Sequence, residues 1–218
     1  MMRQRMWWAA VLSLAAAFGG RALAVDPNEA DAKRWATSTT LQNAQEAYNR
    51  AMNANARYTA FAKKADEEGY GPIASLFRAA ARSRDVHAKA LVEVIKKLGG
   101  EAQADVKVGD VKTTQENLDA TLKAEIYERD ALYPAFLKRA ATDQAPAATR
   151  VFRYAKTAAT GFAKLYEDGL KKLDTLKKAE PAVYCVCTVC GYTVPKADFT
   201  FNKCPSCGQP KEKYVEVK

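Results

Sequence analysis

Apolar and small side chains recur at intervals of three and four residues along most of the chain, and this period predicts α-helices. The first such stretch spans about residues 38–68, with Leu41, Ala44, Tyr48 and Phe61 on one stripe. Three further stripes run over residues 73–95, 118–136 and 152–170. Four amphipathic helices joined by two short turns and one longer link predict a four-helix bundle with one crossover connection.

Turn residues separate these helices. Residues 69–72, Gly-Tyr-Gly-Pro, end the first helix, and Pro72 suits the first position of the second. Thr113 or Thr114 is a plausible N-cap for the third helix, with Gln115 or Glu116 behind it. Pro134 lies inside the third pattern, so we expect a kink or a break there.

The composition changes near the C-terminus. Past Lys178 the helical period is lost, and from Pro181 onward the chain is rich in cysteines, aromatic residues and turn residues. We therefore expect a boundary near residues 179–183, with a bundle over residues 37–179 and a small, β-rich unit over residues 180–218. The predicted fold class is mostly α.

All five cysteines lie in this small unit, and four of them form two C-x-x-C-G knuckles, Cys187 with Cys190 and Cys204 with Cys207. Two thiolates three residues apart can face one ion, and the following glycine permits the positive φ that such a turn uses. Two facing knuckles predict a tetrahedral four-sulfur site for a single metal ion. Because the unit is too small to fold on an apolar core alone, metal binding would contribute its folding energy.

The spacing leaves two questions open. It does not choose between iron, which carries one electron, and zinc, which is redox-inert. A pair of disulfides in an oxidising compartment is the alternative to a metal site. Cys185 is outside the knuckles, and we interpret it as a small buried residue rather than as a spare ligand.

The N-terminus has the pattern of an export signal. Arg3 and Arg5 precede an apolar run over residues 6–18, and Ala22 and Ala24 supply a small-x-small cleavage pattern. Thirteen residues are too few to span about 30 Å of hydrocarbon. We expect cleavage after Ala24, a short leader over residues 25–36, and a periplasmic or otherwise extracytoplasmic protein without a stable membrane span. An uncleaved anchor is the alternative.

Charge and composition exclude some functions. The chain has 218 residues, 48% of them hydrophobic, and a formal net charge of +9 from 34 Lys and Arg against 25 Asp and Glu. The positive charge is spread along helical faces rather than gathered in a block, so it does not indicate nucleic-acid binding. A single histidine, His87, excludes any mechanism that needs two imidazoles.

Both the cysteine-rich unit and the helical part of the sequence resemble a known family. The two knuckles, with Tyr184, Tyr192, Phe199, Phe201 and Tyr214 as a possible aromatic core, are similar to a rubredoxin domain, which holds one iron and shuttles one electron. The preceding segments Arg57-Tyr58-Thr59-Ala60-Phe61-Ala62, Glu68-Gly69-Tyr70, His87-Ala88-Lys89, Thr114-Gln115-Glu116-Asn117-Leu118 and Tyr133-Pro134 resemble the ferritin-like bundle of rubrerythrins. The order of the two parts is also that of rubrerythrins, which are commonly homodimers, so the resemblance implies a homodimer.

The family's di-iron site needs a Glu from each of two helices and a Glu-x-x-His from each of the other two. Carried over residue by residue, these positions are mostly substituted. The first carboxylate position is Ala51, the second helix reads Arg84-Asp85-Val86-His87, and the fourth reads Ala159-Thr160-Gly161-Phe162. His87 and Glu125 remain, with Glu128 as the additional rubrerythrin carboxylate.

Arg84 would place a permanent cation one turn from His87. A guanidinium can donate hydrogen bonds to two carboxylates, so we expect Arg84 to take the place of the lost metal by pairing with Glu125 and Glu128 in the bundle interior. In the alternative, Arg84 extends to solvent and His87 is an ordinary core histidine.

Three functions follow from the resemblance and these substitutions. The first is an exported electron carrier with one iron on the four cysteines, which exchanges electrons with an external donor or acceptor protein. The second is a rubrerythrin-type oxidoreductase that reduces peroxide, for which His87, Glu125 and Glu128 would be the residual ligands. The third is a non-redox module in which zinc fills the four-sulfur site.

Overall fold

The computed structural model describes residues 34–35 and 37–218. The predicted signal, residues 1–24, lies outside the described residues, as does most of the predicted leader, residues 25–36. Among the helices of the described part, none has both the length and the apolar character that crossing a bilayer requires.

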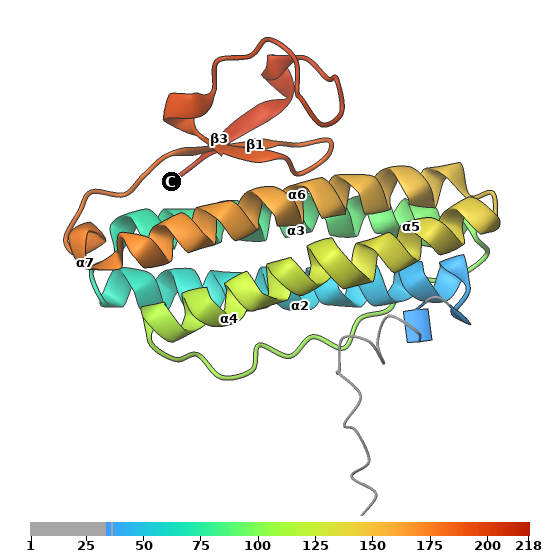
Figure 1. The fold of residues 1–218 in the computed structure, drawn as a ribbon, viewed down its shortest axis with the longest axis horizontal. Helices are drawn as coiled ribbons and strands as arrows, with labels where there is room; N and C mark the ends of the chain where they lie inside the picture. Colours follow the sequence, from blue (N-terminus) through green and yellow to red (C-terminus); the bar gives the residue numbers. More distant parts are fainter. Residues whose placement is uncertain (1–33, 36) are drawn as a thin grey trace, which may run out of the picture.

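The predicted four helical stretches are present and lie side by side as a bundle (Figure 1). They are α2 (Thr40–Glu67), α3 (Gly71–Lys97), the composite of α4 (Thr114–Tyr127), η1 (Glu128–Leu132) and α5 (Tyr133–Thr142), and α6 (Pro146–Lys171). A short helix, α7 (Leu173–Leu176), leads out of the bundle toward the C-terminal unit. Two turns are short and the link between α3 and α4 is long, as the crossover topology requires.

The helix ends follow the sequence signals. Thr113 is the N-cap of α4, and its side chain and that of Glu116 form a capping box. Thr39 and Gln42 form the same box at the start of α2. Pro72 and Pro146 lie in the first turns of α3 and α6, where no backbone donor is needed.

The third helical stretch has neither of the two expected features at Pro134, a kink or a break. The helix is continuous there, but it widens into a π-helical turn, η1, and Pro134 lies in the first turn of α5. The backbone N–H of Tyr133 donates to the carbonyl of Glu128, five residues back. The wider turn accommodates a proline ring that would collide with the carbonyl four residues before it in a regular α-helix.

The long link lies along α2 and is held there by amide side chains. Asn49 accepts a hydrogen bond from the backbone N–H of Asp105 at 3.0 Å. Asn53 accepts from Lys107 N at 2.8 Å and donates to the Asp105 carbonyl at 2.8 Å. An irregular segment thereby satisfies its backbone on one side without forming a sheet.

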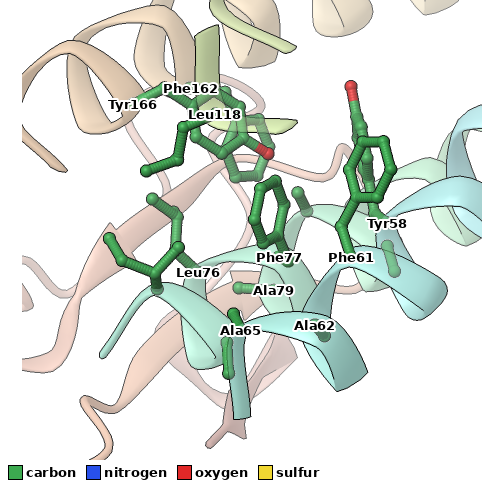
Figure 2. Close-up of a cluster of buried hydrophobic side chains, with 14 of the residues drawn as sticks. Tyr58, Phe61, Ala62, Ala65, Leu76, Phe77, Ala79, Leu118, Phe162 and Tyr166 are labelled. Carbon is green, nitrogen blue, oxygen red and sulfur yellow. The ribbon is translucent and has the colours of Figure 1, made fainter. Parts of the chain in front are cut away.

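Two clusters of apolar side chains fill the bundle, one toward each end. Figure 2 shows the first, in which aromatic rings from different helices point toward one another. Its labelled larger members are Tyr58 and Phe61 of α2, Leu76 and Phe77 of α3, Leu118 of α4, and Phe162 and Tyr166 of α6. Between these two clusters lies the charged group described below.

The C-terminal unit is a three-stranded antiparallel sheet of β1 (Tyr184–Cys187), β2 (Thr193–Pro195) and β3 (Tyr214–Val217), in the order β2-β1-β3. Two 3-10 turns, η2 (Lys196–Asp198) and η3 (Lys211–Lys213), complete it. The unit lies over α3 and α6 (Figure 1).

The aromatic core of this unit contains four of the five predicted residues, with Phe199 and Tyr214 ring centroids 4.8 Å apart and Tyr192 and Phe201 6.3 Å apart. Tyr184 is the exception, and its predicted place was wrong. Successive side chains of a strand point to opposite faces, and Tyr184 and Val186 face the bundle, where both join its apolar cluster. The sheet therefore packs on the bundle through one face of β1 and carries Cys185 and Cys187 on the other.

Candidate metal centre and bundle interior

The four knuckle cysteines meet at one point. Their Sγ atoms all lie within 4.8 Å of one another, with Cys187 and Cys207 3.7 Å apart and Cys190 and Cys204 3.6 Å apart. Ligands at the corners of a tetrahedron with bonds of about 2.3 Å are about 3.8 Å apart, as in iron–sulfur and zinc–sulfur sites. All five cysteines are free in the structure, so the sulfur geometry fits one ion rather than cystines.

Local backbone geometry explains the convergence. The N–H of Gly191 donates to the Cys187 carbonyl and that of Gly208 to the Cys204 carbonyl, both at 2.9 Å. The two glycines have φ of +73° and +72°, which a residue with a Cβ rarely adopts. The two knuckles are thus the same turn made twice.

The sulfurs share their protons unequally. Hydrogen bonds from the Cys190 thiol and from the N–H groups of Val189 and Cys190 outweigh burial and lower the pKa of Cys187 to about 5. The neighbouring Cys187 thiolate and burial raise the pKa of Cys190, and burial raises that of Cys207 to about 11. Since a metal binds thiolates, an ion entering this cluster displaces protons from the cysteines that still hold them.

Burial of the cluster is uneven. Cys187, Cys190 and Cys204 are buried, whereas Cys207 is partly exposed. Tyr192 and Tyr214 of the C-terminal unit pack against the cluster, and so does Tyr154 of α6. The cysteine outside the knuckles, Cys185, is 2% exposed in β1, which agrees with its interpretation as a small buried residue.

The first knuckle is fastened to α3 by two buried hydrogen bonds. Ser83 Oγ donates to the Gly191 carbonyl at 2.8 Å, and His87 Nε2 lies 3.0 Å from the Cys190 carbonyl. A carbonyl only accepts, so His87 carries its proton on Nε2. A Cβ on Gly191 would lie 2.6 Å from both His87 Nε2 and Ser83 Oγ, so glycine is required for this approach as well as for the turn.

His87 is a neutral imidazole turned toward the cysteine centre. Burial and the nearby charge of Arg84 lower its pKa to about 4. It is therefore a hydrogen-bonded core histidine, as in the second of the two interpretations of this residue, and its partner is the carbonyl of Cys190. Among the described residues, the four cysteines are the only cluster of His, Cys, Asp or Glu side chains whose ligand atoms could share an ion, so the structure does not bring His87 together with Glu125 and Glu128.

Arg84 occupies the middle of the bundle, 2% exposed. Its guanidinium lies 2.5 Å from Glu125 Oε1 through Nη2 and 2.8 Å from Glu128 Oε2 through Nη1. The predicted pairing is therefore present, and the solvent-extended alternative is wrong. Tyr58, to which the sequence assigned no chemistry, donates from its hydroxyl to Glu125 Oε1 at 2.9 Å.

Two opposing effects, burial and charge pairing, shift the pKa values of the Arg84 and Glu125 side chains. Burial alone would lower the pKa of Arg84, but Glu125 and Glu128 outweigh it and raise that pKa well above its ordinary value. Burial raises the pKa of Glu125, and the Arg84 guanidinium opposes that rise. Removing either partner would leave the other as an unpaired charge in an apolar setting.

The other positions of the expected di-iron pattern are apolar and buried: Ala51 is 2% exposed, Ala159 0% and Phe162 1%. With a guanidinium between the two remaining carboxylates, these residues present no set of oxygen and nitrogen donors around a shared point. The residues of the bundle interior therefore do not fit a di-iron centre, whereas those of the cysteine cluster fit one ion.

A helical bundle that carries a four-cysteine centre on a small antiparallel sheet defines a class of two-part metal-binding proteins, and comparison with known proteins agrees. The sequence model of the Rubrerythrin family matches residues 43–169, more than half of the chain. The chain belongs to the rubrerythrin family.

Relatives and solved structures extend this finding to both parts of the chain. Nigerythrin of Nitratidesulfovibrio vulgaris is 33% identical over 187 residues, which cover 85% of this chain and 90% of nigerythrin. A protein described as putative rubrerythrin from Methanocaldococcus jannaschii is 35% identical over 195 residues, covering 82% of this chain and 92% of that protein. The structure of nigerythrin in its fully reduced, all-ferrous state superposes with a TM-score of 0.75 at 32% identity, covering 82% of this chain and 87% of the other.

Proposed function

We propose that this protein is a one-electron carrier that holds a single iron on Cys187, Cys190, Cys204 and Cys207. The observation that carries the proposal is the convergence of four sulfurs within 4.8 Å of one another, in a chain of the rubrerythrin family. Bound there, iron supplies a reversible one-electron change between its ferrous and ferric states.

The rest of the chain would act on that centre in two ways. Backbone N–H groups of Val189 and Cys190 stabilise the Cys187 thiolate, which favours the ligand form. Ser83 and His87 bind the carbonyls of Gly191 and Cys190 and hold the first knuckle at a fixed place on α3. The bundle then serves as a rigid base, and little reorganisation is needed when the charge of the centre changes.

We further propose that Arg84 replaces the metal of the bundle. A guanidinium between Glu125 and Glu128 supplies the positive charge that bridging cations would otherwise provide, and it satisfies both carboxylates without an exchangeable ion. The cysteine centre therefore has no internal oxidising site to serve. Its electron donor and acceptor are external proteins.

The cellular setting belongs to the same proposal. The basic, apolar and small-residue pattern of residues 1–24 supports export with cleavage after Ala24, which would place the carrier in the periplasm or another extracytoplasmic space. Membership in the rubrerythrin family supports a homodimer.

Anaerobic reconstitution with ferrous iron tests the function. The expected product is red when oxidised, bleaches with dithionite, regains its colour on reoxidation, and carries one iron per chain. The Cys204→Ser variant should stay colourless, and the Cys185→Ser variant, which changes the cysteine outside the knuckles, should behave as the parent does.

Two results would overturn the proposal. A chain that takes zinc but rejects iron would be a structural or interaction module. A chain that binds three irons and is oxidised in a peroxide-dependent reaction would be an oxidoreductase of the peroxide-reducing kind.

A further inference from the structure

Part of the cysteine centre is accessible at the surface. Cys207 is the partly exposed cysteine of the four, and Val189, inside the first knuckle, is 38% exposed. Val189 and Gln209 line a hollow of about 280 Å³ whose other wall comes from the bundle, with Lys97 of α3 and Arg150 and Tyr154 of α6. The hollow is thus shared by both parts of the chain.

Tyr154 connects this hollow to the sulfurs, because its ring packs against the cysteine cluster from the bundle side. The floor is apolar, formed by Ala90, Val94 and Val151. A partner seated here would contact Val189 of the first knuckle and Tyr154, whose ring packs against the sulfurs, over an apolar centre with a polar rim.

The rim is positively charged. Lys97, Arg150 and the neighbouring Arg153 are exposed, and none of the three has a carboxylate within 4.0 Å among the residues that the structure describes. Glu93, the one acid that lines the hollow, lies 3.6 Å from Lys96 and is offset by it. Unpaired cations around a small apolar floor favour an anionic partner surface.

The other hollow between the two parts has a different character. It is lined by Lys164 and Lys172 but also by Asp168 and Asp198, so its charges balance. It borders Tyr184, β2 and Tyr192, which follows the first knuckle, but no residue between the paired cysteines of either knuckle lines it. This contrast within one molecule assigns the docking role to the first hollow.

We propose that the surface formed by Val189, Gln209, Lys97, Arg150, Arg153 and Tyr154 is the docking site for an electron-carrier protein with an acidic face. The inference rests on the proposed function and adds to it the side of entry and the charge of the partner. Exchange across this face moves one electron, and no proton, between the sulfur centre and the acceptor, which is reduced as the centre is oxidised.

The first experiment needs no redox activity. Zinc-loaded protein is titrated with hexacyanocobaltate(III), a redox-inert anion, and followed by backbone NMR, with hexaamminecobalt(III) as the cationic counterpart. The expected result is a saturable set of shifts at Val189, Gln209, Arg150 and Tyr154 for the anion alone, lost in the Arg150→Glu/Arg153→Glu variant. Shifts spread evenly over the basic surface, or a concentration-dependent broadening of this face without the anion, which would indicate a second copy of the chain, would overturn the proposal.

The second experiment measures electron exchange in the iron-loaded protein with ferricyanide by stopped flow. Arg150→Glu/Arg153→Glu should slow oxidation by about tenfold at low ionic strength, and the difference should shrink as salt is added. The matched control, Lys164→Glu/Lys172→Glu, makes the same charge change at the other hollow and should leave the rate within about twofold. Equal slowing by both variants would overturn the docking site, whereas a chain with no reversible colour would contradict the proposed function and leave the NMR result standing.

Discussion

The bundle interior and the cysteine centre solve the same electrostatic problem in opposite ways. In the interior, two carboxylates are held together by a cation that belongs to the chain, the guanidinium of Arg84. In the centre, four sulfurs converge with no side-chain cation among them and need an ion from outside. We therefore expect the bundle to fold without an added ion, whereas the cysteine unit should depend on a bound metal.

Metal removal should have the largest effect and should be confined to the cysteine unit. Binding of a structural ion to four thiolates contributes on the order of 10 kcal/mol of folding free energy in small domains. In protein stripped of metal under reducing conditions, hydrogen exchange should show β1 and β3 unprotected while α2 and α3 stay protected. If both strands stayed protected in the metal-free protein, the sheet would fold without metal and the prediction would be wrong.

Loss of the interior cation should have the next largest effect on the free energy of unfolding, and this effect should not depend on metal. Arg84→Met leaves Glu125 and Glu128 without their cation, and breaking such a buried pair costs about 3–5 kcal/mol. Urea unfolding measures this, with the exposed Lys123→Met as a control expected within about 0.5 kcal/mol of the parent.

If Arg84→Met does not fold, a second variant can still test whether the unpaired carboxylates cause the loss of stability. Arg84→Met/Glu125→Gln/Glu128→Gln removes the unpaired charges together with the cation and should recover most of the lost stability. If the triple variant did not regain stability, the stability lost in Arg84→Met would come from altered packing and not from unpaired charge.

Substitutions at the junction between the cysteine unit and the bundle should have the next largest effect on stability. Gly191→Ala introduces a Cβ 2.6 Å from Ser83 Oγ and His87 Nε2 at a φ of +73°, whereas Gly208→Ala has φ of +72° and open space. Backbone strain alone costs about 1–2 kcal/mol in both, and the steric clash should add about 1–3 kcal/mol to Gly191→Ala. Equal thermal and urea stabilities of the two variants would show that the knuckle is not fastened to α3.

The smallest expected effect lies at the end of the bundle, where Glu68 accepts a hydrogen bond from Thr114 N at 2.8 Å. Hydrogen bonds from Thr114 and Lys64 outweigh burial and lower the pKa of Glu68 below its ordinary value. A lowered acid pKa stabilises the fold above the unfolded pKa and loses that contribution as pH falls through the folded pKa. Glu68→Gln should therefore cost under about 1 kcal/mol at pH 7, and a series of urea unfolding curves should show the gap closing toward pH 3.

Local signals predicted most of the fold and the metal centre. The three-to-four period marked the helices, and the knuckle spacing placed four sulfurs at one point, because these signals depend on residues close in sequence. The cap before the third helix was predicted at Thr113 or Thr114, and the structure has it at Thr113. The pairing of Arg84 with Glu125 and Glu128 was also predicted, since the family pattern places all three in one interior.

Features that depend on how the two parts meet were not predictable in this way. The place of Tyr184 follows from which face of a three-stranded sheet covers the bundle, and no period exists in a four-residue strand to reveal it. The bonds from Ser83 and His87 to Gly191 and Cys190 join residues more than 100 positions apart, and the only sequence trace is a glycine that the knuckle turn already explains. The π-helical turn before Pro134 was not predicted either, because the proline indicates a disturbed helix at this place but not that the helix continues through a wider turn.

We propose that this chain holds metal in its cysteine centre while a guanidinium occupies its bundle. Native mass spectrometry after anaerobic reconstitution with excess ferrous iron tests it directly, comparing the parent with Cys190→Ser/Cys204→Ser. One iron per chain is expected in the parent and none in the double variant. Two irons retained by the double variant would contradict it.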